Sequence, residues 1–196
     1  MKRVVFCDVD GVLVDGQTQE HLLFYLFDHY KVSFRIFLQV YFWFFLYRLH
    51  FVKNVINIRR CAFRAFRGWR IEEMDSLFND FFKSAVETRL RISVINFLKE
   101  KRLQGYEIIF ISASLSGIVK SIRDHLGFGQ VIATGLEFKE GICTGMIGTV
   151  VPYGIHKLEV AENFIAANGF EWEGSIALGD HISDRLLLER ASCPIA

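Results

Sequence analysis

The sequence predicts an α/β protein with a Rossmann-like, three-layer parallel-sheet core and an inserted all-helical cap. Short β-branched and aromatic runs alternate with stretches of helical periodicity, which is typical of a parallel sheet covered on both faces. This alternation stops between residues 17 and 85, where the pattern is helical throughout. The length of 196 residues suits one domain with an insertion. We therefore expect the core at 1–16 and 86–196 and the cap at 17–85.

The core elements follow one another along the chain. Each predicted strand is a short apolar run bounded by polar residues or glycine: RVVFC, EIIFISAS, QVIATG and SIALGD. Between and after them, helical periodicity predicts helices at SGIVKSIRDHLGFG, HKLEVAENFIAANG and HISDRLLLERA. The segment around Lys139–Gly141 predicts a hairpin. The final residues, CPIA, are typical of the start of one more strand, which would continue in a longer chain.

The predicted cap contains three helical stretches. The first begins near Thr18, which is a suitable N-cap residue. The second spans roughly residues 33–67, and a more polar third one runs from about Ile71 to Glu100. The periodicity thus predicts helices only, and no strand, in the insertion.

Charged and hydroxylated residues stand where the predicted strands end. Asp8, Asp10 and Gly11 follow the first strand, Ser112 ends the second, and Asp180 follows the fourth. The carboxyl ends of parallel strands meet at one edge of an open α/β sheet, where ligands bind. These side chains are therefore expected to converge at this edge, where they could hold a metal, carry phosphate chemistry or merely form a polar strand exit.

The order of these groups, with Lys157 and Asp184 added, resembles the haloacid dehalogenase-like superfamily. The insertion between the first two motifs resembles its phosphoserine phosphatase-like branch. This resemblance implies that Asp8 is a nucleophile that forms an aspartyl phosphate and that Asp10 is the general acid and base.

The same resemblance assigns the remaining site residues. It implies a Mg²⁺ cofactor held by Asp8, the backbone carbonyl of Asp10 and Asp180, with Asp184 orienting Asp180 or a metal-bound water. It implies a substrate phosphoryl group bound by four residues: Gly11, Ser112, Ala113 and Lys157.

At Gln17 the chain departs from the pattern of the phosphoserine phosphatases. These enzymes have a glutamate nine residues past the nucleophile that meets the substrate ammonium group, and this chain has Gln17 there. A neutral amide supplies no charge, which argues against phosphoserine itself, although Asp15 or Glu20 could supply one.

The cap has an unusual composition. Between residues 29 and 70 there are nine Lys or Arg, thirteen aromatic residues and no Asp or Glu. The apolar run 36–47 is too short to span a bilayer as a helix of 1.5 Å rise per residue. Aromatic and cationic residues together are typical of interfacial membrane segments, so residues 34–70 predict peripheral membrane contact. The segment also resembles, loosely, the caps of membrane phosphatidylglycerophosphatases.

Three function classes follow from these observations. We expect first a Mg²⁺-dependent phosphomonoester hydrolase acting on a lipid phosphate or amphipathic phosphomonoester at a membrane surface. The alternative enzyme is a soluble small-metabolite phosphatase, phosphoserine-like, whose oily cap packs on itself or in a homodimer. A non-catalytic membrane-surface adaptor is the third class, and the intact set of acids argues against it. Aromatic residues at this density exceed what base stacking needs, so no nucleic-acid partner is expected.

The cysteines bear on the compartment. The four of them are scattered and show no metal-ligand spacing, which is typical of a reducing environment. The apolar run after Arg3 ends at Asp8, too early for a secretory signal. We expect a cytoplasmic protein, and the lipid hypothesis places it at the inner face of the membrane.

Overall fold

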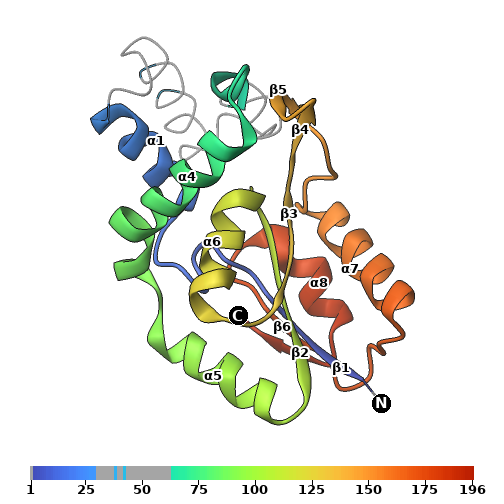
Figure 1. Cartoon of the computed structure of the whole chain (residues 1–196). Coiled ribbons are helices and arrows are strands. Elements are labelled where there is room, and N and C mark those ends of the chain that lie inside the picture. The colour runs from blue at the N-terminus through green and yellow to red at the C-terminus, as the bar shows by residue number, and fades with distance from the viewer. Residues whose placement is uncertain (1, 30–37, 39–41, 43–62) are drawn as a thin grey trace.

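The computed structural model describes residues 2–29, 38, 42 and 63–196. Its centre is a five-stranded sheet in the order β3-β2-β1-β6-β7 (Figure 1). Each strand pairs in parallel with its neighbours, as strands joined by crossover connections do. The predicted Rossmann-like parallel sheet is confirmed, including a strand at the final residues. The strands are β1 (Arg3–Cys7), β2 (Tyr106–Leu115), β3 (Gln130–Thr134), β6 (Ile176–Leu178) and β7 (Cys193–Ile195).

Helices cover both faces of this sheet. One face is covered by α5 (Ile92–Leu103) and α6 (Ser116–Leu126), and the other by α7 (Ile155–Asn168) and α8 (Arg185–Arg190) (Figure 1). Successive side chains of a strand point to opposite faces. In β1, accordingly, Val5 and Cys7 belong to one buried cluster, and Val4 and Phe6 to the other.

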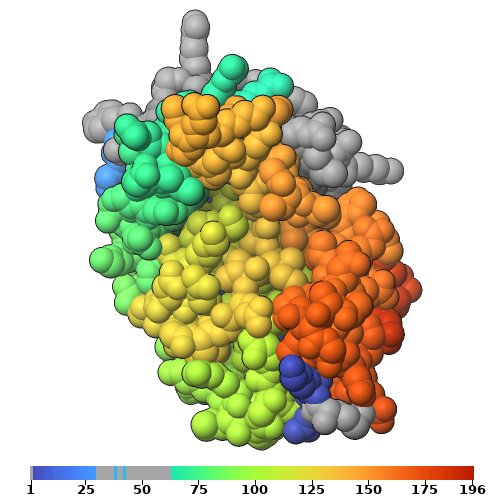
Figure 2. Space-filling view, turned by 45° about the vertical axis from the view of Figure 1, so that its right-hand side comes forward, coloured from blue at the N-terminus to red at the C-terminus, as the bar shows by residue number. Residues whose placement is uncertain are grey.

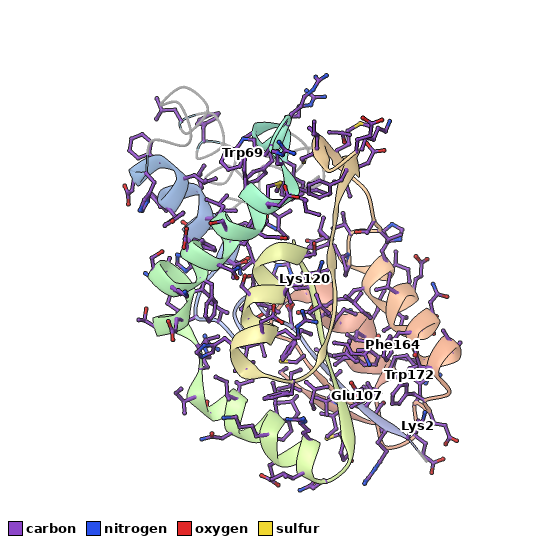
Figure 3. All side chains as sticks on the ribbon, viewed as in Figure 1. Lys2, Trp69, Glu107, Lys120, Phe164 and Trp172 are labelled. Carbon is purple, nitrogen blue, oxygen red and sulfur yellow. The ribbon has the colours of Figure 1, made fainter. Side chains whose placement is uncertain are left out.

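Aromatic residues pack the second face. The ring of Phe6 lies 5.7 Å from that of Trp172 and 6.4 Å from that of Phe164, measured between centroids. Figure 3 shows Phe164 and Trp172 near α7 and the N-terminal end of β1. Since this packing fixes β1 against the α7 layer, the residue that follows the strand is held in a rigid frame.

The described residues of the predicted cap include four helical segments, the last of which ends one residue past it, and a fifth segment follows in the predicted core. They are α1 (Thr18–Asp28), the 3₁₀ turn η1 (Arg64–Phe66), α4 (Ile71–Phe81), the π-helical η2 (Phe82–Val86) and the 3₁₀ turn η3 (Glu87–Arg89). Buried residues of α4, among them Leu77 and Phe81, belong to the same hydrophobic cluster as Val5 and Ile118 of the core. One continuous apolar cluster therefore joins these segments to the sheet.

A hairpin from the core contacts the cap. Its strands are β4 (Leu136–Lys139) and β5 (Ile142–Ile147), which pair antiparallel as predicted. The Gly68 amide donates to the Cys143 carbonyl at 2.8 Å, and the Cys143 amide donates to the Trp69 carbonyl at 2.8 Å. Figure 2 shows the hairpin beside the residues that precede and form α4. Backbone hydrogen bonds thus fasten this part of the cap to the core.

The prediction of one helix from Ile71 to Glu100 is wrong. The chain leaves α4 through η2 and η3, and Leu90 is extended, with φ −66° and ψ 128°. The Asp15 amide donates to the Arg89 carbonyl, and the Arg91 amide donates to the Leu13 carbonyl, both at 2.9 Å. This pairing with the loop after β1 ends the helix, and α5 begins only at Ile92.

The predicted N-cap at Thr18 is also wrong, because Thr18 is the first residue of α1 and Gln17 is the N-cap. The prediction of a helix over about 33–67 lies largely outside the described residues. The remaining predicted elements match the structure within a few residues. Among them, α6 and α7 end at Gly127 and Gly169, both in the left-handed conformation that glycine adopts readily.

Candidate active site

Three acidic side chains meet at the carboxyl ends of the strands. Asp8 directly follows β1, Asp180 lies two residues after β6, and Asp184 ends the 3₁₀ turn η4 (Ile182–Asp184). One carboxylate oxygen from each lies within 4.8 Å of the others, with Asp8 and Asp184 buried and Asp180 exposed. The predicted convergence of these three residues is therefore present in the structure.

Lys157, from the first turn of α7, lies between two of these acids. Its Nζ atom is 3.1 Å from Oδ1 of Asp8 and 2.6 Å from Oδ1 of Asp184. Burial by itself would lower the pKa of Lys157, but the two adjacent carboxylates outweigh it and raise this pKa. The buried lysine is therefore charged and neutralises part of the acidic cluster.

Asp184 has two hydrogen-bond partners that the sequence analysis did not assign to it. Its Oδ1 accepts a hydrogen bond from Lys157, and its Oδ2 accepts one from the His181 amide at 3.2 Å. The sequence analysis expected Asp184 to orient Asp180 or a metal-bound water. The structure places it first against the lysine, and its carboxylate reaches the cluster of Asp8 and Asp180 as a third oxygen source.

The ionisation of Asp8 depends on its surroundings. Burial raises the pKa of Asp8 from 3.8 to about 7, since the charge of Lys157 only partly compensates and Asp184 and Asp10 act in the opposite direction. Burial and the charge of Asp184 also raise the pKa of Asp180. Lys157 therefore does not balance the negative charge of the three carboxylates. A further cation would favour their ionised form.

These residues fit a Mg²⁺ ion. Mg²⁺ prefers carboxylate, carbonyl and water oxygens, and the cluster offers oxygens from Asp8, Asp180 and Asp184 that lie within 4.8 Å of one another. When bound there, the ion would supply positive charge beside a substrate phosphoryl group. The Asp10 carbonyl, the fourth group in the predicted site, remains an expected ligand.

Gly11 brings the loop after β1 against Asp180. Its φ is +78°, and a Cβ atom at this position would overlap the carboxylate of Asp180. The Gly11 amide donates to the carbonyls of Val14 at 2.9 Å and Gly16 at 3.1 Å. In the structure this glycine therefore closes the loop and admits Asp180, while its predicted contact with phosphate stays a prediction.

Substitution of Gly11 by alanine should destabilise the fold and weaken Mg²⁺ binding at least about tenfold, since strain at positive φ adds to displacement of Asp180. The matched control is Gly105→Ala, where φ is +85° and nothing lies within 4 Å of the added Cβ. Calorimetric titration with Mg²⁺ and thermal unfolding of both variants check this. Equal Mg²⁺ affinity in the two variants would contradict the assigned role of Gly11.

The end of β2 supplies the predicted phosphate-binding residues. Ser112 is buried, and its Oγ accepts a hydrogen bond from the Ser114 amide at 3.0 Å. The carbonyl of Ala113 accepts hydrogen bonds from Gln19 Nε2 at 3.2 Å and Thr134 Oγ1 at 2.8 Å. The backbone conformation at this strand end is thus fixed from the cap and from β3.

Two residues that the sequence analysis did not assign contact Asp10. The Thr18 amide donates to Oδ1 of Asp10 at 2.7 Å, and Ser114 Oγ donates to Oδ2. The two hydroxyl oxygens, of Thr18 and Ser114, lie 2.7 Å apart. No clear signal in the sequence pointed to these contacts, because the register of β2 against β3 shifts between Ser112 and Leu115 and strand alternation does not hold there.

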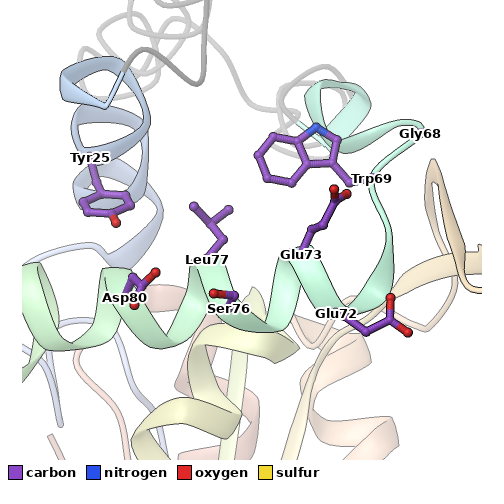
Figure 4. A pocket seen from close by; sticks show the side chains of 8 residues that line it. All are labelled: Tyr25, Gly68, Trp69, Glu72, Glu73, Ser76, Leu77 and Asp80. Carbon is purple, nitrogen blue, oxygen red and sulfur yellow. The ribbon is translucent and has the colours of Figure 1, made fainter.

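A separate cavity of about 730 Å³ lies between α1 and α4 (Figure 4). It includes three acidic side chains, which would repel an anionic phosphate group. None of its lining residues belongs to the cluster at the strand ends, which therefore remains the candidate phosphate site. The lining residues are Tyr25, Gly68, Trp69, Glu72, Glu73, Ser76, Leu77 and Asp80.

Comparison with known families tests this assignment. The model of the haloacid dehalogenase-like hydrolase family matches residues 5–189, which include the whole strand-end cluster. The chain belongs to this family. Within the haloacid dehalogenase-like hydrolases, the resemblance inferred from the sequence to the phosphoserine phosphatase-like branch is also confirmed by the relatives.

The relatives of this haloacid dehalogenase-like hydrolase include a phosphoserine phosphatase of Archaeoglobus fulgidus, 29% identical over 53% of this chain and 29% of that protein. A probable phosphatase of Mycobacterium tuberculosis is 26% identical over 62% of this chain and 42% of that protein. The match thus spans less than half the length of these curated relatives.

Solved structures share the fold. A Bordetella pertussis protein of unknown function superposes with a TM-score of 0.89 at 17% identity, covering 100% of this chain and 90% of that one. A phosphoserine phosphatase in apo form superposes with a TM-score of 0.68 at 19% identity, covering 100% of this chain and 86% of the other. These superpositions support the Rossmann-like core with helical additions found in the structure.

Proposed function

We propose that this haloacid dehalogenase-like hydrolase is a Mg²⁺-dependent phosphomonoester phosphatase in which Asp8 is the nucleophile. The observation that carries the proposal is the cluster after β1 and β6, where the buried Lys157 lies together with three carboxylates. A phosphoryl group bound there would meet Asp8 at the end of a rigid strand, beside a cation that offsets the developing charge.

The residues divide the chemistry between them. An oxygen of Asp8 attacks phosphorus to form an aspartyl phosphate, and the bond to the leaving alcohol breaks. Asp10 gives a proton to that alcohol and later takes one from the water that hydrolyses the intermediate. Ser112, the Ala113 backbone and Lys157 hold the phosphoryl oxygens, which requires Lys157 to share its donors with the substrate.

For the substrate, the relatives favour the small-metabolite alternative over the lipid hypothesis. Phosphoserine phosphatases recur among the relatives and structural neighbours. Residues 34–70, which suggested a lipid phosphate and membrane contact, lie largely outside the described residues. Among the helices that the structure describes, none is long and apolar enough to cross a membrane. We therefore propose a small phosphomonoester as the substrate and keep a lipid phosphate as the second candidate, on the composition of residues 29–70.

Phosphate release with and without Mg²⁺ tests the proposal. Soluble phosphomonoesters, O-phosphoserine among them, should be compared at matched concentration with liposomes carrying phosphatidylglycerophosphate or lysophosphatidate. Turnover of the soluble esters is the expected result, and EDTA should abolish it. Turnover confined to liposomes would make the lipid phosphate the substrate. Absence of turnover on both, with Mg²⁺ bound, would favour the non-catalytic adaptor.

A further inference from the structure

The Asp10 carboxylate is held from two sides. Its Oδ1 accepts a hydrogen bond from the Thr18 amide at 2.7 Å, and its Oδ2 accepts one from Ser114 Oγ. Ser114 belongs to the core strand β2, whereas Thr18 is the first residue of α1. Asp10 therefore lies where the core and the first helix of the insertion meet.

The start of α1 depends on Asp10. Gln17 occupies the N-cap position but makes no side-chain capping hydrogen bond. The first amides of a helix have no partner within the helix, and its N-terminus favours a negative charge. The Asp10 carboxylate supplies both a hydrogen-bond acceptor for the Thr18 amide and a negative charge at the helix N-terminus. Asp10 stands eight residues before Thr18 in the chain. The position of α1 and the orientation of Asp10 are thus coupled.

The two hydroxyl groups complete this contact away from water. Thr18 and Ser114 are both fully buried, and their hydroxyl oxygens are 2.7 Å apart. Each hydroxyl has one proton to donate. Since Ser114 donates to Asp10, its oxygen can accept from Thr18, which gives a chain from Thr18 through Ser114 to Asp10. Loss of the Ser114 hydroxyl would take one donor from the half-buried Asp10 carboxylate and leave the buried Thr18 hydroxyl without its acceptor.

We propose that Ser114 and Thr18 are positioning residues that hold Asp10 in the orientation in which it protonates the leaving alcohol. The proposal rests on the proposed function, in which the bond from Asp8 to phosphorus forms, the bond from phosphorus to the alcohol oxygen breaks, and that oxygen receives the proton of Asp10. Ser114 and Thr18 touch neither the phosphoryl group nor a metal ion in this assignment, and they act through Asp10 alone.

The dependence of the rate on the leaving group tests this role. Phenyl phosphate and p-nitrophenyl phosphate have similar shapes but different leaving groups. The p-nitrophenolate anion is stable enough to leave without a proton, whereas the more basic unsubstituted phenolate depends strongly on protonation by Asp10. In Ser114→Ala, kcat/KM for phenyl phosphate should fall about 10- to 100-fold, and that for p-nitrophenyl phosphate by at most about threefold. Thr18→Val should act in the same direction, while Thr18→Ser, which keeps the hydroxyl, should restore most of the rate.

Ser121→Ala is the matched control. Ser121 is also buried, and its hydroxyl joins α6 to α4 through Asn79 Oδ1 at 3.0 Å, so it links core and cap elsewhere. Its removal should change kcat/KM for the two esters by the same factor. An equal fall for both esters in Ser114→Ala would overturn the positioning role and leave a structural one.

Hydrogen exchange of the Thr18 amide gives a second readout that needs no turnover. This amide donates to Asp10 Oδ1, so its exchange reports how firmly Asp10 is held. Ser114→Ala should accelerate it at least about tenfold, and Ser121→Ala should leave it unchanged. Unchanged exchange in Ser114→Ala would overturn the proposal. Lack of turnover of both esters by the unmodified protein would instead contradict the proposed function, and the exchange result would still decide how Asp10 is held.

Discussion

Substitution of Asp8 by asparagine should reduce Mg²⁺-dependent phosphate release at least about 10⁴-fold, because an amide cannot form the aspartyl phosphate. The buried side chain keeps its shape in this variant, so the loss would lie in kcat. The matched control is Asp124→Asn, since Asp124 is an exposed carboxylate paired with Arg123 at 2.7 Å. Activity of Asp8→Asn within tenfold of the unmodified protein would remove Asp8 from the role of nucleophile.

The same variant should show a pH-dependent gain in stability. The pKa of Asp8 is raised to about 7 in the fold, so its contribution to the free energy of unfolding is fully present below pH 3.8 and is lost as pH rises through about 7. Asparagine does not titrate. In EDTA, the stability of Asp8→Asn relative to the unmodified protein should therefore increase between pH 5 and pH 8, as urea unfolding would measure.

Substitution of Lys157 by methionine should have the largest effect on stability. It leaves the buried carboxylates of Asp8 and Asp184 without their cation, and breaking a buried pair in this way costs about 3–5 kcal/mol. The cost should be greater at pH 8 than at pH 5, because the carboxyl group of Asp8 takes up a proton as pH falls through its pKa of about 7. Phosphate release should also fall about 10²- to 10³-fold.

Two further variants make this result specific. Lys139→Met removes a lysine whose side chain is 72% exposed, and unfolding free energy should change by no more than about 0.5 kcal/mol. The double variant Lys157→Met/Asp184→Asn removes one of the orphaned charges, so it should recover part of the stability but none of the activity. Equal stability of Lys157→Met and the unmodified protein at pH 8 would show that Lys157 does not stabilise the ionised carboxylates of Asp8 and Asp184.

The strand ends could be predicted from the sequence because their signals are local. One buried apolar run stops at Asp8, and another stops just before Gly179–Asp180. Each pattern predicts a parallel strand that is followed closely by a charged residue. Because the alternation of strands and helices predicts a parallel sheet, the carboxyl ends of these strands are expected at the same edge. This reasoning needed no knowledge of side-chain contacts, and the structure has the three acids within 4.8 Å.

The contacts between these side chains have no local signal. The hydrogen bond between Lys157 and Asp184 joins residues 27 apart, and both had been assigned to other partners. The break before α5 was missed because residues 82–91 contain no proline or glycine. There the backbone of Arg89 and Arg91 forms hydrogen bonds with the loop after β1 instead of continuing a helix. These tertiary contacts override the helical periodicity of the sequence.

The hydrophobic cluster shared by α4 and the sheet limits how such enzymes can be recombined. A graft that exchanges residues 17–85 for the insertion of a relative would cut within η2 and replace Leu77 and Phe81, which pack in one cluster with Ile118 of α6. The incoming segment would meet a surface shaped for different side chains. Exchange of the insertion in this chain should therefore include α6, so that the two packing surfaces stay complementary.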